Sequence, residues 1–442
     1  MKFAAALMLM LPLIASGRVP LAKTEEEGEI WAVLVAGTEE WDEYRFEADI
    51  CHAYQILSAN GIPDDHIVVM MFDNIADNMV NPFPGKIFNS PTGDDVYAGV
   101  PKDYTGLQVN PENFFKVLRG DAEGLKGIGS GKVINSGPND RIFISIEGFG
   151  DTGIFYFPRD LMRANDFANL VMELKQNNIF KEMMVYMGSS CSGSMFQDLF
   201  PDDIGFYALS AADLVETTYA AYCFDAPIYN CLGDIFGVSW MEDVDAKDPN
   251  TELLKENFEV AKERTYLSTV MQWGQKAIEN EPVAAFMGSK GSYTSPPKNY
   301  SVEERKASVV PSRDVPLVNL QKRLRDAITL EEKARLSSEI TALKNKRSMV
   351  KHVTEKIVLR VAGDEKLAQE LMTRKQEKIT AWDCYKDAVD AFHDNCLRLG
   401  KTTFATNVVP TLLNLCESGY NSDVIVQATK IVCVFPAIHN DH

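Results

Sequence analysis

Apolar residues in the first two thirds of the chain form short runs that alternate with segments of helical spacing. Residues 30–36 are a continuous apolar run, which is typical of a strand buried on both faces. Residues 46–60 have helical spacing and are followed by Gly61-Ile-Pro63, which stops a helix. Further strands are predicted at 66–72, 141–147, 183–187 and 205–210. This alternation predicts an α/β fold with a parallel sheet covered on both faces and a site at the carboxyl ends of its strands.

The pattern becomes helical at Thr329. Thr329-Leu-Glu-Glu332 is a capping box, and Gly363 is the predicted end of a long helix. An apolar stripe follows this helix, formed by Leu336, Ile340, Leu343, Val350, Val353, Ile357 and Val361. We therefore predict an all-α domain at 329–442, a linker at 288–328, and an α/β domain at 18–287 whose Pro/Gly/Asn-rich loop at 74–110 forms a rim of the site.

The N-terminus has the form of a signal peptide at 1–17. Lys2 precedes an apolar run that is too short to span a bilayer, and small residues follow it. No later segment has the ~18 uninterrupted apolar residues of a membrane span. The formal net charge of −19 argues against nucleic acid as a partner. We expect a protein of the secretory pathway, lysosomal, endosomal or secreted, with glycosylation at Asn299 in Asn299-Tyr-Ser301.

Four of the eight cysteines gather near the C-terminus. Cys384, Cys396, Cys416 and Cys433 predict two disulfides with three possible connectivities, and a zinc site is the less favoured alternative because no CxxC pair is present. The others, Cys51, Cys191, Cys223 and Cys231, stand among apolar or aromatic residues and are expected to be buried free thiols. No metal or other cofactor is predicted.

Two predicted strands end in segments of the kind that present catalytic groups. Residues 184–194 run from an apolar strand into a small-residue turn that contains Cys191. Residues 141–150 carry Phe149 near their end, where a base would be expected. No histidine lies between His66 and His352. A cysteine nucleophile needs a base or a lowered pKa, so the local sequence lacks a requirement of the chemistry that its pattern suggests.

Several runs closely resemble the legumain (asparaginyl endopeptidase) family. They are Trp31-Ala-Val-Leu-Val-Ala-Gly37, Cys51-His-Ala-Tyr-Gln55, Asn60-Gly-Ile-Pro63, Gly99-Val-Pro-Lys-Asp-Tyr-Thr-Gly106, Val117-Leu-Arg-Gly-Asp121, Gly127-Ile-Gly-Ser-Gly-Lys132 and Ser239-Trp-Met-Glu-Asp243. The resemblance implies a caspase-like α/β domain and a helical prodomain that caps the active site. It also implies the pairs Cys384–Cys416 and Cys396–Cys433, with the other four cysteines free.

The resemblance places three catalytic positions on altered residues. The family's histidine base matches Phe149, its cysteine nucleophile matches Ser190, and its catalytic asparagine matches Glu43. Cys191 stands one residue after the nucleophile position, and we expect it to need a local bulge to face the cleft. Gly150 matches a residue of the oxyanion hole.

The specificity pocket is retained in part. In the family an Arg, a Glu and an Asp read the substrate asparagine, and the matching residues are Arg45, Gly188 and Asp234. The sequence therefore predicts an inactive pseudoprotease that binds peptides, cystatin-like inhibitors or protease partners. The alternative is an active Asn/Asp-specific endopeptidase with an unorthodox site. The RGD triplet that begins at Arg119 is interpreted as a helix end, with an integrin ligand as the alternative.

Overall fold

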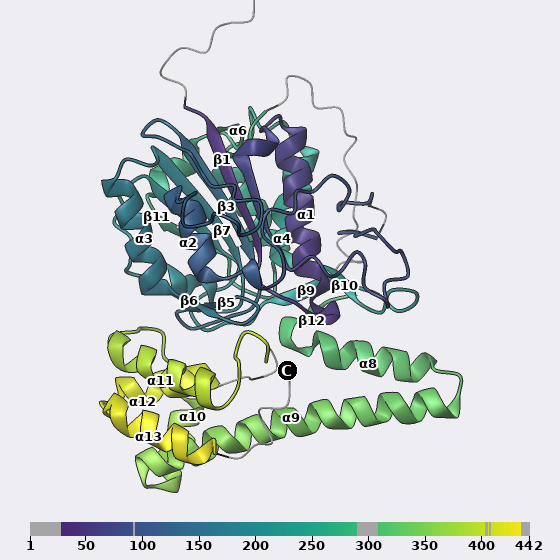
Figure 1. Ribbon diagram of the computed structural model, residues 1–442, viewed down its shortest axis with the longest axis vertical. Coiled ribbons are helices and arrows are strands. Elements are labelled where there is room, and N and C mark those ends of the chain that lie inside the picture. The colour runs from purple at the N-terminus through teal and green to yellow at the C-terminus, as the bar shows by residue number, and fades with distance from the viewer. Residues whose placement is uncertain (1–27, 92, 290–307, 403–404, 406–407, 435–442) are drawn as a thin grey trace, which may run out of the picture.

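A computed structural model describes residues 28–91, 93–289, 308–402, 405 and 408–434. The predicted signal peptide and the sequon at Asn299 lie outside these residues. The centre of the described chain is a six-stranded sheet in the order β11-β8-β7-β3-β1-β2 (Figure 1). Its strands are β1 (Ile30–Ala36), β2 (Ile67–Met70), β3 (Arg141–Glu147), β7 (Glu182–Gly188), β8 (Phe206–Ser210) and β11 (Met271–Gly274). All neighbouring pairs are parallel except β11 with β8, so the predicted parallel sheet has one antiparallel edge strand.

Helices cover both faces of this sheet. Alternate residues of β1 divide between two apolar cores: Leu34 packs in the core that contains α1 (Tyr44–Ala59) and α4 (Ile235–Ala246), and Val33 in the core that contains α2 (Pro111–Arg119) and α3 (Ala164–Gln176). This alternation is the expected consequence of a strand buried on both faces. The other helices of this part are α5 (Leu254–Arg264) and α6 (Ala284–Met287).

Two small sheets extend the carboxyl edge of the large one. One contains β4 (Gly150–Asp151), β5 (Ile154–Tyr156) and β6 (Leu161–Arg163), and the other has the order β10-β9-β12. In the latter, β12 (Val310–Pro311) pairs antiparallel with β9 (Tyr219–Cys223), and β9 pairs with β10 (Cys231–Asp234). A segment predicted as linker therefore returns to the edge of the α/β part.

The C-terminal part is helical, as predicted. Thr329 caps α9 (Leu330–Ala362) by accepting the backbone N–H of Glu332 at 3.1 Å, and Gly363 ends it with a left-handed φ of 69°. Four shorter helices follow: α10 (Glu365–Thr373), α11 (Trp382–Asn395), α12 (Val408–Glu417) and α13 (Ser422–Val432). One further helix, α8 (Val315–Asp326), lies within the predicted linker and runs beside α9 under the α/β part (Figure 1).

The cysteine predictions are confirmed in the C-terminal part and wrong at one pair elsewhere. Cys384–Cys416 and Cys396–Cys433 are bonded, with Cα atoms 5.7 and 5.1 Å apart. Cys51 and Cys191 are free and buried. Cys223 and Cys231, expected to be free, form a third disulfide. They are direct partners across the β9–β10 ladder, and this register brings their side chains together.

The RGD triplet has the structural role that the sequence favoured. Arg119 ends α2 and makes a two-pronged ion pair with Glu173, with N–O distances of 2.9 and 2.7 Å. Gly120 has a φ of 70°, which suits the residue after a helix, and Asp121 accepts the N–H of Gly124. Among the described residues no helix is long and apolar enough to cross a membrane.

Candidate active site

The nucleophile position, Ser190, follows the end of β7 and is used as a local hydrogen-bond acceptor. Its Oγ accepts the backbone N–H of Thr218 at 3.0 Å and lies 3.3 Å from the hydroxyl of Thr217. The side chain is buried. These contacts hold the loop after β8 against the end of β7, and neither partner is a base that could remove the hydroxyl proton.

The adjacent thiol, Cys191, lies beside Ser190 but is a poor nucleophile. β7 ends at Gly188, and Cys191 adopts a left-handed φ of 56°, so the alternation of a strand no longer separates the two residues. Both line one cavity of 380 Å³ together with Arg313. Burial, followed by the nearby Asp151 carboxylate, raises the pKa of Cys191 to about 12. The thiol is therefore protonated in the physiological range.

The base position is occupied by an aromatic ring. Phe149 is buried and packs edge-on against Phe46 with ring centroids 5.2 Å apart. The guanidinium carbons of Arg45 and Arg313 lie 5.3 and 5.7 Å from its centroid. Two cations thus lie within cation–π distance of the ring. This stabilises the ring, but a phenyl group cannot accept a proton. The four histidines in the described ranges make their contacts elsewhere: His52, His66, His352 and His393.

The third position, Glu43, caps the turn that precedes α1. Its carboxylate accepts the backbone N–H groups of Glu39 and Glu40, both at 3.1 Å. Burial raises the pKa of Glu43 to about 8. Its hydrogen bonds are with its own turn, so the side chain supports the local backbone.

Gly150 lies directly against the nucleophile position. A side chain there would come within 2.7 Å of the Ser190 carbonyl oxygen and 2.8 Å of the Ser189 hydroxyl. The Gly150 carbonyl accepts from Arg313 at 2.9 Å. The close approach explains why glycine is needed and matches the position that the resemblance gives to the oxyanion hole.

The predicted pocket residues Arg45 and Asp234 come together in a buried cluster. Burial lowers the pKa of Arg45, and Asp234 opposes this shift more than the other nearby carboxylates do. Burial raises the pKa of Asp234 to about 7. Asp49 accepts the Asp234 N–H at 2.9 Å and joins the cluster. Sequence reasoning missed Asp49, and it also missed Glu147, the last residue of β3, whose side chain lies beside Gly188. A charged residue at the end of the apolar run 141–147 was the signal available for it.

A segment from outside the α/β part fills this pocket. We call Val310–Asp314 the strap. The strap continues the β9 sheet through β12 and through a bond from the Ser312 N–H to the Thr218 carbonyl at 3.0 Å. The Ser312 hydroxyl accepts from Arg45 at 2.7 Å, and Ser312 is fully buried. The pocket arginine is thus bound to the protein's own chain.

Arg313 fixes the strap over the catalytic positions. Its guanidinium donates to the Gly150 carbonyl at 2.9 Å and to the Asp151 carboxylate at 2.8 Å. From the opposite side, Arg347 of α9 donates to the Arg313 carbonyl at 2.6 Å and to Asp314 at 2.8 Å. The strap is therefore held by both parts of the molecule.

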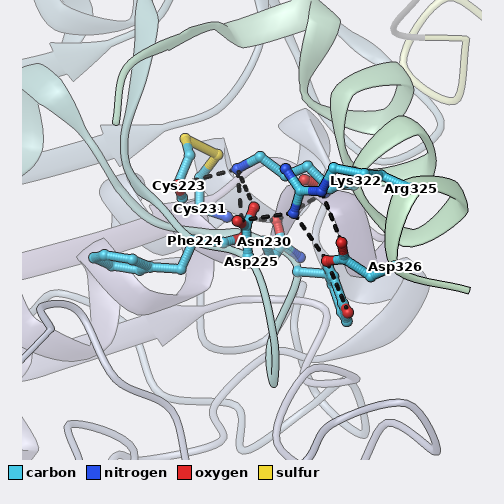
Figure 2. Close-up of polar contacts among 10 residues, drawn as sticks. Cys223, Phe224, Asp225, Asn230, Cys231, Lys322, Arg325 and Asp326 are labelled. Carbon is cyan, nitrogen blue, oxygen red and sulfur yellow. Dashed lines mark hydrogen bonds and ion pairs between the residues drawn. A yellow bond between two sulfur atoms is a disulfide. The ribbon is translucent and has the colours of Figure 1, made fainter. Parts of the chain in front are cut away.

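The helix that follows the strap is held by the disulfide hairpin (Figure 2). Lys322 of α8 donates to the Cys223 carbonyl at 3.1 Å, and Arg325 forms an ion pair with Asp225 at 2.8 Å. The Cys223–Cys231 bond closes the base of this hairpin.

The C-terminal helices also contact the site. The Tyr385 hydroxyl of α11 donates to the Thr152 carbonyl at 2.5 Å. Residues 372–376, the end of α10 and the loop after it, line the cavity that Ser190 also lines.

We expect Arg313→Ala to loosen the strap. The side chain is only 10% exposed and pairs with the buried carboxylate of Asp151. Its loss should therefore make the free energy of strap attachment less favourable by about 3 kcal/mol. Limited proteolysis of the full-length protein, with cuts mapped within 308–326, should then be at least tenfold faster. Arg335→Ala removes an exposed pair within α9 and is the matched control. Equal rates for the two variants would show that Arg313 does not hold the strap.

This geometry defines an α/β protein whose site lies at the carboxyl ends of β3 and β7 and is covered by its own helical C-terminal part. The chain belongs to the peptidase C13 family. Residues 30–289 match the model of that family, and residues 338–433 match the model of the legumain prodomain. The resemblance inferred from the sequence is thereby confirmed.

Individual relatives agree over nearly the whole chain. Legumain from Mus musculus is 40% identical over 438 residues, which cover 98% of this chain and 99% of that protein. Legumain from Homo sapiens is 40% identical over 95% of this chain and 96% of its own length. The hemoglobinase of Schistosoma mansoni is 34% identical over 93% of each chain. Among solved structures, caspase-1 from Spodoptera frugiperda aligns with a TM-score of 0.33 and 10% identity over 62% of this chain and 98% of that one.

Proposed function

We propose that this legumain-family homologue does not hydrolyse peptide bonds and acts by binding. The observation that carries the proposal is the Phe149 ring at the base position, with the guanidinium groups of Arg45 and Arg313 within about 6 Å of its centroid. A nucleophile and its base act as one unit, and removing one member abolishes most of the activity of both. Here Ser190 bonds to Thr218 and the Cys191 thiol has a raised pKa, so neither candidate nucleophile is activated.

The ligand that suits the edge of β9 is an extended peptide. The strap already adds to this edge as an antiparallel strand and places one polar side chain against Arg45. Strand addition of this kind gives affinity through main-chain hydrogen bonds and specificity through side-chain pockets. We propose peptides and exposed loops of cystatin-like inhibitors or protease partners as ligands, in a lysosomal, endosomal or secreted location that suits a protein with three disulfides.

A protein without a catalytic unit cannot process itself. The resemblance to legumains, which are cut near the linker after Asn or Asp, matches their processing stretch to Arg325-Asp-Ala327. Asp326 ends α8, and its carboxylate accepts from Arg325 at 2.7 Å and from the Tyr229 hydroxyl at 3.2 Å. We expect purified full-length protein held at pH 4 to keep its length for days, as judged by intact mass. A cut after Asp326 in material free of other proteases would refute the proposal.

A further inference from the structure

A second concave surface lies on the α/β part, outside the site described above. It is a groove of about 760 Å³, lined by residues from the end of α4, from α5 and from the 3-10 helix Lys276–Asn280. All of its lining residues fall between 247 and 279, so neither the strap nor a C-terminal helix contributes to it. Five of them are carboxylates: Asp248, Glu252, Glu256, Glu259 and Glu279.

The two lysines of this groove leave it acidic. Lys247 pairs with Asp243 at 2.9 Å and with Glu252 at 2.8 Å, so one ammonium group serves two buried carboxylates. Lys255 donates to the side-chain oxygen of Asn280 at 3.4 Å and is not used by a carboxylate there. Three further carboxylates of the groove accept from uncharged donors: Asp248, Glu256 and Glu279. The groove thus keeps an excess of negative charge.

Glu252 is the buried carboxylate of the groove, and one of its oxygens lacks a donor. Its side chain is 2% exposed, and Oε2 has no hydrogen-bond partner among the described residues. Burial raises the pKa of Glu252 to about 8, the adjacent Asp243 carboxyl adds to the shift, and Lys247 opposes it. Tyr186 of β7 faces the same pair of carboxylates. A buried acceptor without a donor costs free energy, so this wall of the groove is one cation or one proton short.

We propose that the groove binds a basic segment of a partner protein, and that one arginine side chain of this segment pairs with Glu252. A guanidinium group presents several N–H donors in one plane and matches a carboxylate. Further basic side chains would lie against Glu256 and Glu259, which are three residues apart and exposed on α5. A groove of this volume suits side chains, and in the described part of the chain no three His, Cys, Asp or Glu side chains are placed to hold a metal ion.

Binding is expected to displace a proton from Glu252. Below pH 8 this carboxyl is mostly protonated, whereas pairing with arginine requires the ionised form. Affinity should therefore rise as the pH rises toward 8. Exposed carboxylates and arginine do not titrate between pH 6 and 8, so contacts at the edge of the groove add nothing to this slope. The strap stays in place throughout, and the result does not depend on whether the strap-covered site takes a ligand.

The test is a titration of fluorescein-labelled hexa-arginine amide with full-length protein at low salt, followed by polarisation. We expect Glu256→Gln with Glu259→Gln to weaken binding about fivefold at pH 8. Asp202→Asn with Asp203→Asn is the matched control, because it removes two exposed charges from the loop before β8, and it should change the affinity by less than about twofold. Equal weakening by the two pairs would show a general attraction to an acidic protein and would overturn the proposal.

Glu252→Gln tests the buried pairing, since glutamine keeps the size of the side chain and an oxygen for Lys247. The affinity of the parent should rise about tenfold from pH 6 to pH 8, and that of the variant by less than about twofold. Calorimetry of the parent in two buffers of different ionisation enthalpy gives a check without a variant: about one proton released per peptide at pH 7. An equal slope in both proteins, or no proton release, overturns the role of Glu252. Tighter binding by Ser312→Ala/Arg313→Ala protein than by the parent would place the peptide under the strap and overturn the proposal as well.

Discussion

Full-length protein carrying Glu43→Asn, Phe149→His, Ser190→Cys, Cys191→Ser and Arg313→Ala is expected to hydrolyse a fluorogenic Asn peptide. The scaffold already places Gly150 against position 190, so a base at position 149 would face a thiol at a pre-formed strand edge. Arg313→Ala also removes one of the two cations that would keep an imidazole at position 149 from accepting a proton. General base catalysis should raise the rate by roughly 10²–10⁴ over the parent.

The control is the same variant with Ser190→Ala in place of Ser190→Cys, which keeps the base and removes the nucleophile. Gly188 stays unchanged because its Cβ would collide with Glu147. Both proteins must show the three disulfides and the melting profile of the parent. A folded five-fold variant no faster than its control would mean that residues beyond these positions block the chemistry.

The stability of the protein is expected to fall as the pH rises from 5 to 8. Burial raises the pKa of Glu43 to about 8 and that of Asp234 to about 7, whereas in the unfolded chain both titrate near 4. A group whose folded-state pKa is raised contributes stability in full below its unfolded pKa, and this contribution is lost as the pH rises through the folded value. For Glu43 the loss is on the order of 3 kcal/mol.

Glu43→Gln isolates this effect because glutamine keeps an acceptor for the N–H groups of Glu39 and Glu40 but does not ionise. The difference in melting temperature between variant and parent should be small at pH 5 and grow by several degrees toward pH 8 in favour of the variant. A difference that is constant with pH would show that Glu43 does not titrate in this range.

Much of the fold followed from local pattern. The continuous apolar run gave β1 its exact bounds, and the capping box and Gly363 fixed both ends of α9. The helix α8 lies within the segment 288–328 that was predicted as a linker, although its Pro316 is well suited to the first turn of a helix. Two-residue strands such as β12 exist only through their partners, which no local pattern indicates.

The candidate site was predictable one residue at a time but not as an assembly. The positions of Phe149, Ser190 and Arg45 followed from the resemblance. The Cys223–Cys231 bond, the strap and Glu147 depend on which strands are neighbours and in what register. Glu147 was passed over because a carboxylate at a strand end looks solvent-exposed until the sheet partner is known.

The central claim is that the site has no working pair of nucleophile and base. The most direct measurement is turnover of a fluorogenic Asn peptide at pH 4 to 8 by full-length Ser312→Ala/Arg313→Ala protein, with Cys191→Ala and Ser190→Ala versions alongside. All three proteins should give the rate of buffer alone at every pH. Turnover by the Ser312→Ala/Arg313→Ala protein that disappears when Cys191→Ala or Ser190→Ala is added would contradict the account and identify the nucleophile.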